Sequence, residues 1–347
     1  MPMSTDKVSF QEFAENGDLL KLTMRQAALQ SESAFLKSIE WPSCRVTLID
    51  TGILLLEPKG PAPTSERKNI VISCGVHGNE TAPIEIVNQI VKDICSGQLK
   101  VKSSLLLIIG NPLAIIEGNR FTAENLNRLF KENLNTGENY ETIRAKKLMN
   151  VLKSFYGEAN NIHYDLHTAI RASVHEKFAI YPYQGDKPCS LDQLSFLQAS
   201  GINTILFSHA PAGTFSYHSN NVYGADAFTI ELGQVKNFGK NDMRNFLDIS
   251  RNLKLLIQGE VVPIRKFDAE EFNLFSVCHE IINTSDNFRF HITEDIKNFT
   301  TFPTGTLLSE DGDNQYRTSN RDESIVFPNP NVPVGQRVAL VIKPTDI

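Results

Sequence analysis

The chain has 347 residues, 41% of them hydrophobic and 21% charged, which is enough to bury a substantial core in one large and one small domain. The formal net charge is −6, and no cluster of lysine and arginine interleaves with aromatic residues, which argues against nucleic acid as a partner. The five cysteines are odd in number and widely spaced, so no disulfide framework is expected and a reducing, cytoplasmic location fits best. The polar N-terminus and the lack of an apolar stretch near about 18 residues argue against secretion and membrane spanning.

The expected elements fall into three parts along the chain. Residues 1–44 are interpreted as an N-terminal extension, 45–260 as the catalytic domain and 261–347 as a small β-rich domain. In the middle part, apolar β-like segments alternate with helical patterns, which predicts an α/β fold with a mixed sheet flanked by helices. The expected strands lie at 46–57, 69–75, 104–112, 162–167, 177–183, 202–208 and 227–233, and the expected helices at 82–95 and 241–259. Beyond 260, short β-rich pieces are expected at 261–267, 275–284, 288–292 and 337–344.

The segment VISCGVHGNETAP at 71–83 carries the first candidate site. An apolar strand stops at glycine and presents His77 and Glu80 in an H-x-x-E spacing, directly before a helical pattern. Loops between strand and helix are where open α/β sheets carry their chemistry. An imidazole and a carboxylate are good zinc ligands, but a catalytic zinc site needs about three protein ligands. A third donor is therefore expected elsewhere in the chain.

The best candidate for that third donor is His167 in NIHYDLHTAIR. Alternation along this strand places His167 and Asp165 on one face, where Asp165 would orient the histidine or act through a metal-bound water. His77, Glu80 and His167 would make a His₂Glu site. The other histidines are interpreted as mostly structural or exposed: His163, His175, His209, His218, His279 and His291. For His209 and His218 the alternative is a place on a loop near the site.

Two further polar segments follow expected strands. The segment 111–130 is expected to be a long polar loop that supplies Arg120, Asn127 and Arg128, whose donors suit a carboxylate or a developing oxyanion. The alternative is that these arginines lie on a solvated helical face. In AFTIELG, Glu231 lies near the end of a strand, where it is either simply exposed or a general base beside a metal-activated water.

Five motifs, in this order, resemble the succinylglutamate desuccinylase and aspartoacylase family of the zinc carboxypeptidase superfamily. They are GxHGNExAP at 75–83, NPxAxxxGxRF at 111–121, xLNRLF at 125–130, DLHTAIR at 165–171 and TIELG at 229–233. The resemblance covers nearly the whole chain. Two residues depart from the family pattern, because Asn125 stands where the family usually has Asp and Phe121 stands where Tyr is common.

The resemblance implies a zinc-dependent amidohydrolase with one Zn²⁺ per subunit and a zinc carboxypeptidase-like fold. Residue by residue, it implies that His77, Glu80 and His167 bind zinc, and that Glu231 is the general base and acid. It further implies a carbonyl-polarising role for Arg120 and a carboxylate clamp of Asn127 and Arg128, with Arg171 as a second carboxylate contact.

Within the family, DLHTAIR and TIELGQVKNFGKND favour hydrolysis of N-succinyl-L-glutamate to succinate and L-glutamate. This is the last step of the arginine succinyltransferase route of arginine breakdown. The expected partner is thus a small acylated amino acid with several carboxylates. The alternatives are an aspartoacylase-like or other N-acylamino-acid deacylase, a peptidase, and a protein that binds a metal or carboxylate without turnover. The sequence does not indicate the oligomeric state or the residues that recognise the succinyl group.

Overall fold

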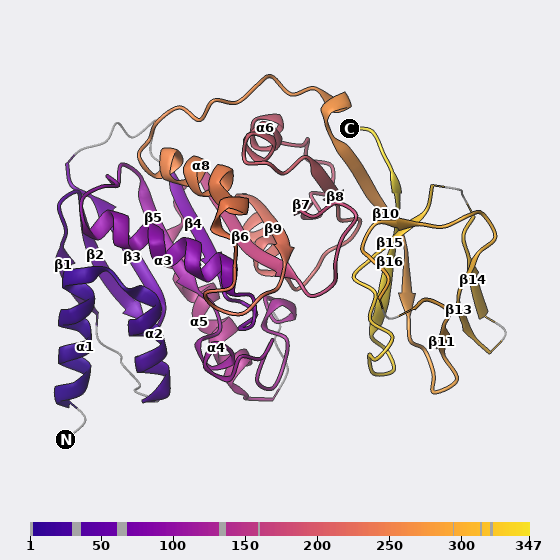
Figure 1. Ribbon diagram of the computed structural model, residues 1–347, viewed down its shortest axis with the longest axis horizontal. Coiled ribbons are helices and arrows are strands. Elements are labelled where there is room, and N and C mark those ends of the chain that lie inside the picture. Colours follow the sequence, from indigo (N-terminus) through magenta and orange to yellow (C-terminus); the bar gives the residue numbers. More distant parts are fainter. Residues whose placement is uncertain are drawn as a thin grey trace.

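The structure, a computed structural model, describes residues 3–29, 36–60, 68–131, 137–158, 160–293, 295–312, 314–319 and 322–347. These residues form an α/β fold in which a long sheet runs through the molecule and continues into a β-rich C-terminal part (Figure 1). The prediction of a mixed sheet flanked by helices, with a small β-rich C-terminal domain, is therefore confirmed.

Helices and strands alternate through most of the chain. The α-helices of the described residues are α1 (Met3–Asn16), α2 (Leu19–Ala28), α3 (Thr81–Cys95), α4 (Pro112–Glu117), α5 (Tyr140–Phe155), α6 (Leu191–Ala199), α7 (Phe215–Tyr223) and α8 (Leu247–Ile257). Short 3₁₀ helices are η1 (Leu126–Arg128), η2 (Met243–Phe246) and η3 (Ala269–Glu271). The strands of the first part are β1 (Lys37–Glu40), β2 (Cys44–Asp50), β3 (Ile53–Pro58), β4 (Asn69–Cys74), β5 (Ser104–Ile109), β6 (Asn161–Ala169), β7 (Phe178–Tyr181), β8 (Thr204–Phe207) and β9 (Asp226–Gln234). Those of the C-terminal part are β10 (Asn273–Ile282), β11 (Arg289–Phe290), β12 (Thr300–Thr301), β13 (Leu307–Asp311), β14 (Asn314–Arg317), β15 (Ser324–Val326) and β16 (Arg337–Pro344).

The main sheet has the strand order β1-β2-β3-β5-β4-β6-β9-β7-β8-β10-β16-β15-β12, and β11, β13 and β14 form a separate small sheet. Strands β5, β4, β6 and β9 are parallel neighbours, so their carboxyl ends lie along one edge. The register places Ser73 of β4 beside Asp165 of β6, and His167 of β6 beside Glu231 of β9. Chain segments far apart in the sequence thus meet at the carboxyl ends of β4, β6 and β9.

The two faces of these strands differ sharply in chemistry. On one face Ile72, Tyr164, Leu166 and Ile230 pack with α3 and α8, which lie in front of the sheet in Figure 1. On the other face Val71 packs with α5 and α7. The neighbouring positions of this face on β4 and β6 are polar. Because successive strand residues point to opposite faces, the alternating pattern of β6 separates apolar from polar side chains. The polar side chains of this face, all of them buried, are Ser73, His163, Asp165, His167, Thr229 and Glu231.

Two expected elements are shorter or more divided than predicted. The helix expected over 241–259 begins as the 3₁₀ segment η2, where the Asp242 side chain accepts from the Arg244 backbone N–H at 3.2 Å, and becomes α-helical only at Leu247. The segment 111–130 is not one long loop, because it holds α4 and η1. Asn111 caps α4 by accepting from the Ala114 N–H at 3.3 Å, and Pro112 occupies its first turn.

The prediction of a β-strand at 261–267 is wrong. These residues are irregular, and Val261 is 90% exposed. Pro263 has no N–H to donate to a neighbouring strand, so the apolar residues here contact the core as part of a connection rather than as a strand. The strand expected at 288–292 is reduced to the two residues of β11. Helix α3 begins and ends within one residue of the predicted range of 82–95.

The N-terminal helices pack on the body of the fold. Helix α2 contacts α3 and α4, and the Trp41 indole N–H donates to the Ala14 carbonyl at 3.0 Å. The domain boundaries expected at 44 and 260 stay predictions. In the part of the chain that the structure describes, no helix is both long and apolar enough to cross a membrane.

Candidate active site

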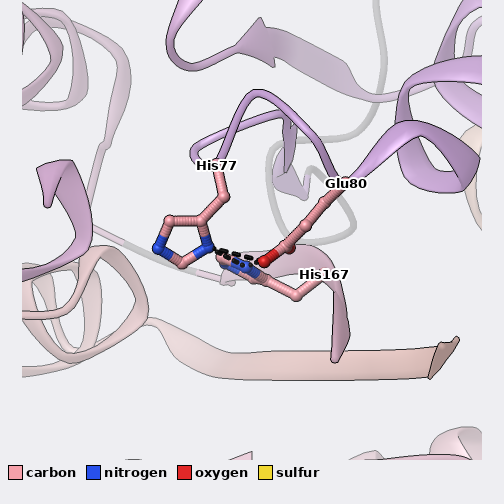
Figure 2. Close-up of side chains that lie close together, drawn as sticks. All are labelled: His77, Glu80 and His167. Carbon is pink, nitrogen blue, oxygen red and sulfur yellow. Dashed lines mark hydrogen bonds and ion pairs between the residues drawn. The ribbon is translucent and has the colours of Figure 1, made fainter. Parts of the chain in front are cut away.

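The three predicted metal ligands converge on one point. His77 follows β4, Glu80 directly precedes α3 and His167 lies on β6, yet their ligand atoms all lie within 4.8 Å of one another (Figure 2). Glu80 places one carboxylate oxygen 2.8 Å from His77 Nδ1 and the other 2.8 Å from His167 Nδ1. The two Nδ1 atoms are 3.2 Å apart. Nitrogen ligands about 2.0–2.1 Å from a tetrahedral zinc ion are separated by roughly 3.3 Å, so this spacing suits one shared cation.

The far nitrogens of the two histidines are already bonded to the protein. His77 Nε2 lies 2.9 Å from Asn125 Oδ1, and His167 Nε2 lies 2.9 Å from Asp165 Oδ2. An oxygen of either kind accepts from an N–H, so each Nε2 carries a proton and the Nδ1 atom of each ring is the one that faces Glu80. The donor set of two imidazole nitrogens and a carboxylate therefore fits a zinc-like cation in both chemistry and direction.

The pKa shifts of Glu80, His77 and His167 also favour a bound cation. Burial would raise the pKa of Glu80, but His77 and His167 outweigh it and hold this pKa well below its usual range. Burial lowers the pKa of His77 to about 4. Burial would lower the pKa of His167 as well, but Asp165 and Glu80 raise it well above its ordinary value. A proton and a divalent cation thus compete for the same position between two carboxylates.

Arg120 reaches the same carboxylate from the segment after α4. Its Nη1 donates to Glu80 Oε1 at 2.8 Å, while about a third of the side chain stays exposed (31%). The turn that carries His77 packs tightly against this segment, because the Gly78 N–H donates to the Arg120 carbonyl at 3.1 Å. A Cβ atom at Gly78 would lie 2.2 Å from the Ala114 carbonyl carbon, so the approach of the two segments requires glycine.

Glu231 is the second carboxyl group at the site. It lies beside His167 in the sheet, is buried, and its Oε2 has no hydrogen-bond partner among the described residues. Burial, followed by the charge of Glu80, raises the pKa of Glu231 to about 7. A buried carboxyl group that exchanges its proton near neutral pH is suited to general acid–base chemistry.

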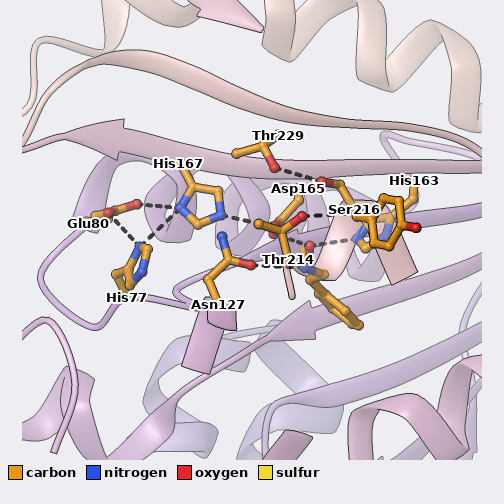
Figure 3. Close-up of polar contacts among 12 residues, drawn as sticks. His77, Glu80, Asn127, His163, Asp165, His167, Thr214, Ser216 and Thr229 are labelled. Atoms are coloured by element: carbon orange, nitrogen blue, oxygen red, sulfur yellow. Dashed lines mark hydrogen bonds and ion pairs between the residues drawn. The ribbon is translucent and has the colours of Figure 1, made fainter. Parts of the chain in front are cut away.

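The predicted clamp residues Asn127 and Arg128 lie in η1. Asn127 is buried, and its Oδ1 accepts from the Phe215 N–H of α7 at 2.9 Å, whereas its amide N–H₂ makes no hydrogen bond among the described residues (Figure 3). Arg128 donates from Nη1 to the Asn127 carbonyl at 2.8 Å. Burial, followed by the charges of Arg337 and Arg120, lowers the pKa of Arg128 to about 10. The Arg128 side chain remains accessible to solvent, so its guanidinium is flanked by protein and still open to a ligand.

The other sequence candidates lie elsewhere. Arg171 donates from Nε to the Pro328 carbonyl at 2.6 Å, a contact with the C-terminal part rather than with the group around Glu80. His209 is 41% exposed and its Nε2 lies 3.9 Å from Glu280 Oε1, whereas His218 is buried in α7. His163, predicted to be structural or exposed, is fully buried and bonded to two serines.

Sequence reasoning missed the residues that hold the site in place. Asn125 was noted only as a departure from the family pattern, but it is the partner of His77. Glu141 of α5 accepts from the Thr122 N–H at 2.7 Å and from the Asn111 amide at 3.2 Å, which fixes the segment that carries Arg120. A buried glutamate in the first turn of a helix gives no signal in the sequence that distinguishes it from an exposed one.

A parallel sheet edge that collects a buried His–Glu–His group, an arginine and a buried carboxyl group with a pKa near 7 is typical of hydrolases that act on amide bonds. Residues 66–257 match the succinylglutamate desuccinylase/aspartoacylase catalytic domain, and residues 270–345 match the AstE/AspA barrel-sandwich hybrid domain. The chain belongs to the succinylglutamate desuccinylase/aspartoacylase family, a family of hydrolases.

Individual relatives agree with this assignment. The chain is 45% identical over 344 residues to a succinylglutamate desuccinylase of Shewanella pealeana, which covers 97% of this chain and 98% of the relative. A solved structure of the Vibrio parahaemolyticus succinylglutamate desuccinylase has a TM-score of 0.85 at 34% identity, covering 94% of this chain and 95% of that one. The Chromobacterium violaceum enzyme has a TM-score of 0.82 at 34% identity, covering 94% and 98%. Both the catalytic part and the β-rich C-terminal part are therefore shared with these enzymes.

Proposed function

We propose that the protein hydrolyses N-succinyl-L-glutamate to succinate and L-glutamate, and that it does so with one zinc ion held by His77, Glu80 and His167. The observation that carries this proposal is the buried Oε2 of Glu231, which has no hydrogen-bond partner among the described residues and belongs to the strand beside His167 and its two fellow ligands. The choice of substrate is supported by the names of relatives that match the chain along nearly its whole length.

The metal and the protein have separate tasks in this proposal. A zinc ion at this position supplies Lewis acidity, which lowers the pKa of water and polarises the amide carbonyl. Glu231 takes one proton from the attacking water, whose oxygen bonds to the succinyl carbonyl carbon. When the C–N bond breaks, Glu231 delivers that proton to the leaving amine of glutamate. Its raised pKa suits both directions of transfer.

Arg120 stabilises the charge that develops on the carbonyl oxygen. Its guanidinium is held beside the ligand group by Glu80, so a donor is already directed at the reacting centre before substrate binds. Removing one such donor typically costs about 2.7–4 kcal/mol of the barrier.

The substrate carries three carboxylates, and the site offers cationic and amide donors for them. We assign the carboxylate next to the scissile amide to the Asn127 amide N–H₂ and the Arg128 guanidinium, which come from one turn of η1. We retain Arg171 as a candidate for a second carboxylate, which requires its guanidinium to exchange the Pro328 carbonyl for substrate.

The biological setting is part of the same proposal. Hydrolysis of succinylglutamate would be the last step of the arginine succinyltransferase route of arginine breakdown. A cytoplasmic location is supported by the five cysteines, all of which are free. We also propose a division into an extension at 1–44, a catalytic domain at 45–260 and a β-rich domain at 261–347. Its basis is the change of sequence pattern along the chain.

The experiment is an assay of amine release from N-succinylglutamate and N-acetylaspartate by metal-stripped protein, before and after one equivalent of zinc is added. The Glu231→Gln variant tests the base, and Glu260→Gln, an exposed position after α8, is its matched control. We expect zinc-dependent release from succinylglutamate that is lost in Glu231→Gln and kept in Glu260→Gln. Preference for acetylaspartate would instead assign the aspartoacylase-like activity. Zinc binding without release from either substrate would overturn the proposed reaction.

A further inference from the structure

A continuous row of buried hydrogen bonds runs from α7 to His167 on the polar face of the sheet. Ser219 Oγ lies 2.7 Å from His163 Nδ1, and His163 Nε2 lies 2.8 Å from Ser73 Oγ. Ser73 donates to Asp165 Oδ1 at 2.5 Å, and Asp165 Oδ2 faces His167 Nε2 at 2.9 Å. Figure 3 shows His163, Asp165 and His167 in this row. We call Ser219, His163, Ser73 and Asp165 the positioning chain.

We propose that His163 is a positioning residue for the metal site, acting through Ser73 and Asp165 to fix His167 as an Nδ1 ligand. The proposal rests on the metal site assigned above and deepens it. His163 itself is separated from the ligand group by two side chains, so its influence passes through hydrogen bonds rather than contact.

The direction of every hydrogen bond in the positioning chain follows from the charge on Asp165. An ionised carboxylate only accepts, so Ser73 gives its single hydroxyl proton to Asp165. The Ser73 oxygen can then only accept, which requires His163 to donate from Nε2. A neutral His163 with its proton on Nε2 accepts at Nδ1 from the Ser219 hydroxyl. On the other side, His167 donates from Nε2 to Asp165, and its Nδ1 lone pair is left for the cation.

The protonation states needed for this direction agree with the surroundings. Burial lowers the pKa of His163 to about 4, so the ring is neutral at pH 7. Asp165 faces a donor with each of its oxygens, Ser73 Oγ at Oδ1 and His167 Nε2 at Oδ2, which is the arrangement of an ionised carboxylate that only accepts. Ser73, His163, Asp165 and Ser219 are each fully buried, so water does not replace a missing partner.

Helix α7 connects the positioning chain with the substrate clamp. The Ser216 hydroxyl lies 2.7 Å from the Thr229 hydroxyl of β9, and the Phe215 N–H holds Asn127. The Phe215 ring also packs edge-on against the His163 ring at 4.7 Å. One helix thus fixes the orientation of His163 and the position of Asn127 together.

Two substitutions of His163 separate the hydrogen bond from the packing. The amide of glutamine reaches about as far as imidazole Nε2, so His163→Gln keeps a donor to Ser73 and loses the acceptor for Ser219. The amide of asparagine matches Nδ1 instead, so His163→Asn keeps the contact with Ser219 and loses the donor. Both variants remove the ring from Phe215. We expect His163→Gln to stay within about threefold of the wild-type zinc Kd, and His163→Asn to weaken binding by about tenfold or more.

Metal affinity is measured by chelator competition, without reference to turnover. The second readout is the ¹⁵N–¹H signal of His167 Nε2–H in histidine-labelled protein, which we expect in the wild type and His163→Gln and not in His163→Asn. Ser73→Ala breaks the next link and should weaken zinc binding as much as His163→Asn. The Ser73→Ala/His163→Asn double variant should lose no more than about threefold beyond either single change, because both act on one chain.

Several results would overturn the proposal. Equal loss of zinc affinity in His163→Gln and His163→Asn would show that His163 only fills space, as would additive losses in the double variant. If His163→Asn does not fold, unchanged zinc affinity in Ser73→Ala would overturn the proposal on its own. Failure of the wild type to bind zinc would instead overturn the metal assignment, and the His167 signal would still report whether the chain sets the position of the proton.

Discussion

The two faces of β4, β6 and β9 are both buried but differ in chemistry. The face under α3 and α8 consists of interlocking aliphatic and aromatic side chains, such as Leu166 and Ile230. The opposite face of the same strands, from Ser73 across to Glu231, is equally buried but carries hydroxyl, imidazole and carboxyl groups. The comparison teaches that burial stabilises the fold on one face and directs hydrogen bonds and charges on the other.

The difference follows from the twofold alternation of a strand. In NIHYDLHTA each apolar residue from Ile162 to Leu166 is followed by a polar one, so one strand serves both faces. Because unsatisfied buried polar groups are costly, most polar side chains of this face are paired, and the pairs restrict the ligand His167, whereas Oε2 of Glu231 is left without a partner among the described residues. Substitutions on the two faces should therefore give different kinds of damage.

The largest effect is expected for Glu231→Gln. The amide keeps the shape of the side chain and removes the proton acceptor, so kcat/KM on succinylglutamate should fall by about 10²–10⁴-fold. Zinc affinity should stay near that of the wild type, because Glu231 is not a ligand in this account. Steady-state kinetics and chelator competition on the same preparation measure both quantities. If the variant kept more than about a tenth of the wild-type activity, Glu231 would not be the general base.

A pair of neighbouring substitutions on β6 compares the faces directly. Asp165→Asn should weaken zinc binding by about 10–100-fold, because it replaces the carboxylate that accepts from His167. Leu166→Ala, one residue along and on the opposite face, should cost about 2–5 kcal/mol of unfolding free energy with little change in zinc Kd. Denaturant unfolding of the metal-free proteins measures the unfolding free energy, and chelator competition measures the zinc Kd. Similar profiles for the two variants would contradict the division of the sheet into two faces.

Arg128→Ala tests the clamp at the edge of the polar face. Loss of a charge-assisted contact of about 1.5–3 kcal/mol should raise KM for succinylglutamate by roughly tenfold or more, with a smaller change in kcat. Arg289→Ala, an exposed arginine in β11, is the matched control and should leave KM unchanged. Unchanged KM in Arg128→Ala would show that the carboxylate is held elsewhere.

The smallest effect is expected for Asn125→Asp, which restores the residue usual in the family. A carboxylate in place of the amide oxygen that faces His77 Nε2 should make the ring a stronger ligand and tighten zinc binding by about threefold. Asn119→Asp, an exposed position in the same segment, controls for the added charge. Weaker binding in Asn125→Asp would show that His77 does not donate to residue 125.

The sequence was sufficient for the parts of the site that lie within short motifs. The spacing of His77 and Glu80 and the alternation around His167 predicted the ligand group, and the structure brings these three side chains together. The positioning chain could not be predicted from the sequence, because the contact of Ser73 with Asp165 depends on the register between β4 and β6. The partner of His163 depends likewise on how α7 docks. Pairings between distant segments leave no mark in a single sequence.

The errors in the fold have a similar origin. The apolar residues of 261–267 have the composition of a strand, but Pro263 and the lack of a neighbouring edge leave them as a connection. Arg171, which stays a candidate for substrate binding, shows the same dependence on distant segments, because its Nε donates to the Pro328 carbonyl more than 150 residues later. Local patterns thus predicted which side chains gather around Glu80 more reliably than which distant segments they contact.

The most direct test of the account is a titration of metal-stripped protein with zinc, in which the rate of succinylglutamate hydrolysis is followed at each addition, in parallel with Glu80→Gln. The account predicts a rate that rises linearly and reaches its plateau at about one zinc per chain, with tight binding and activity both lost in Glu80→Gln. Full hydrolysis by the metal-stripped protein, or a plateau that Glu80→Gln also reaches at one equivalent, would contradict it.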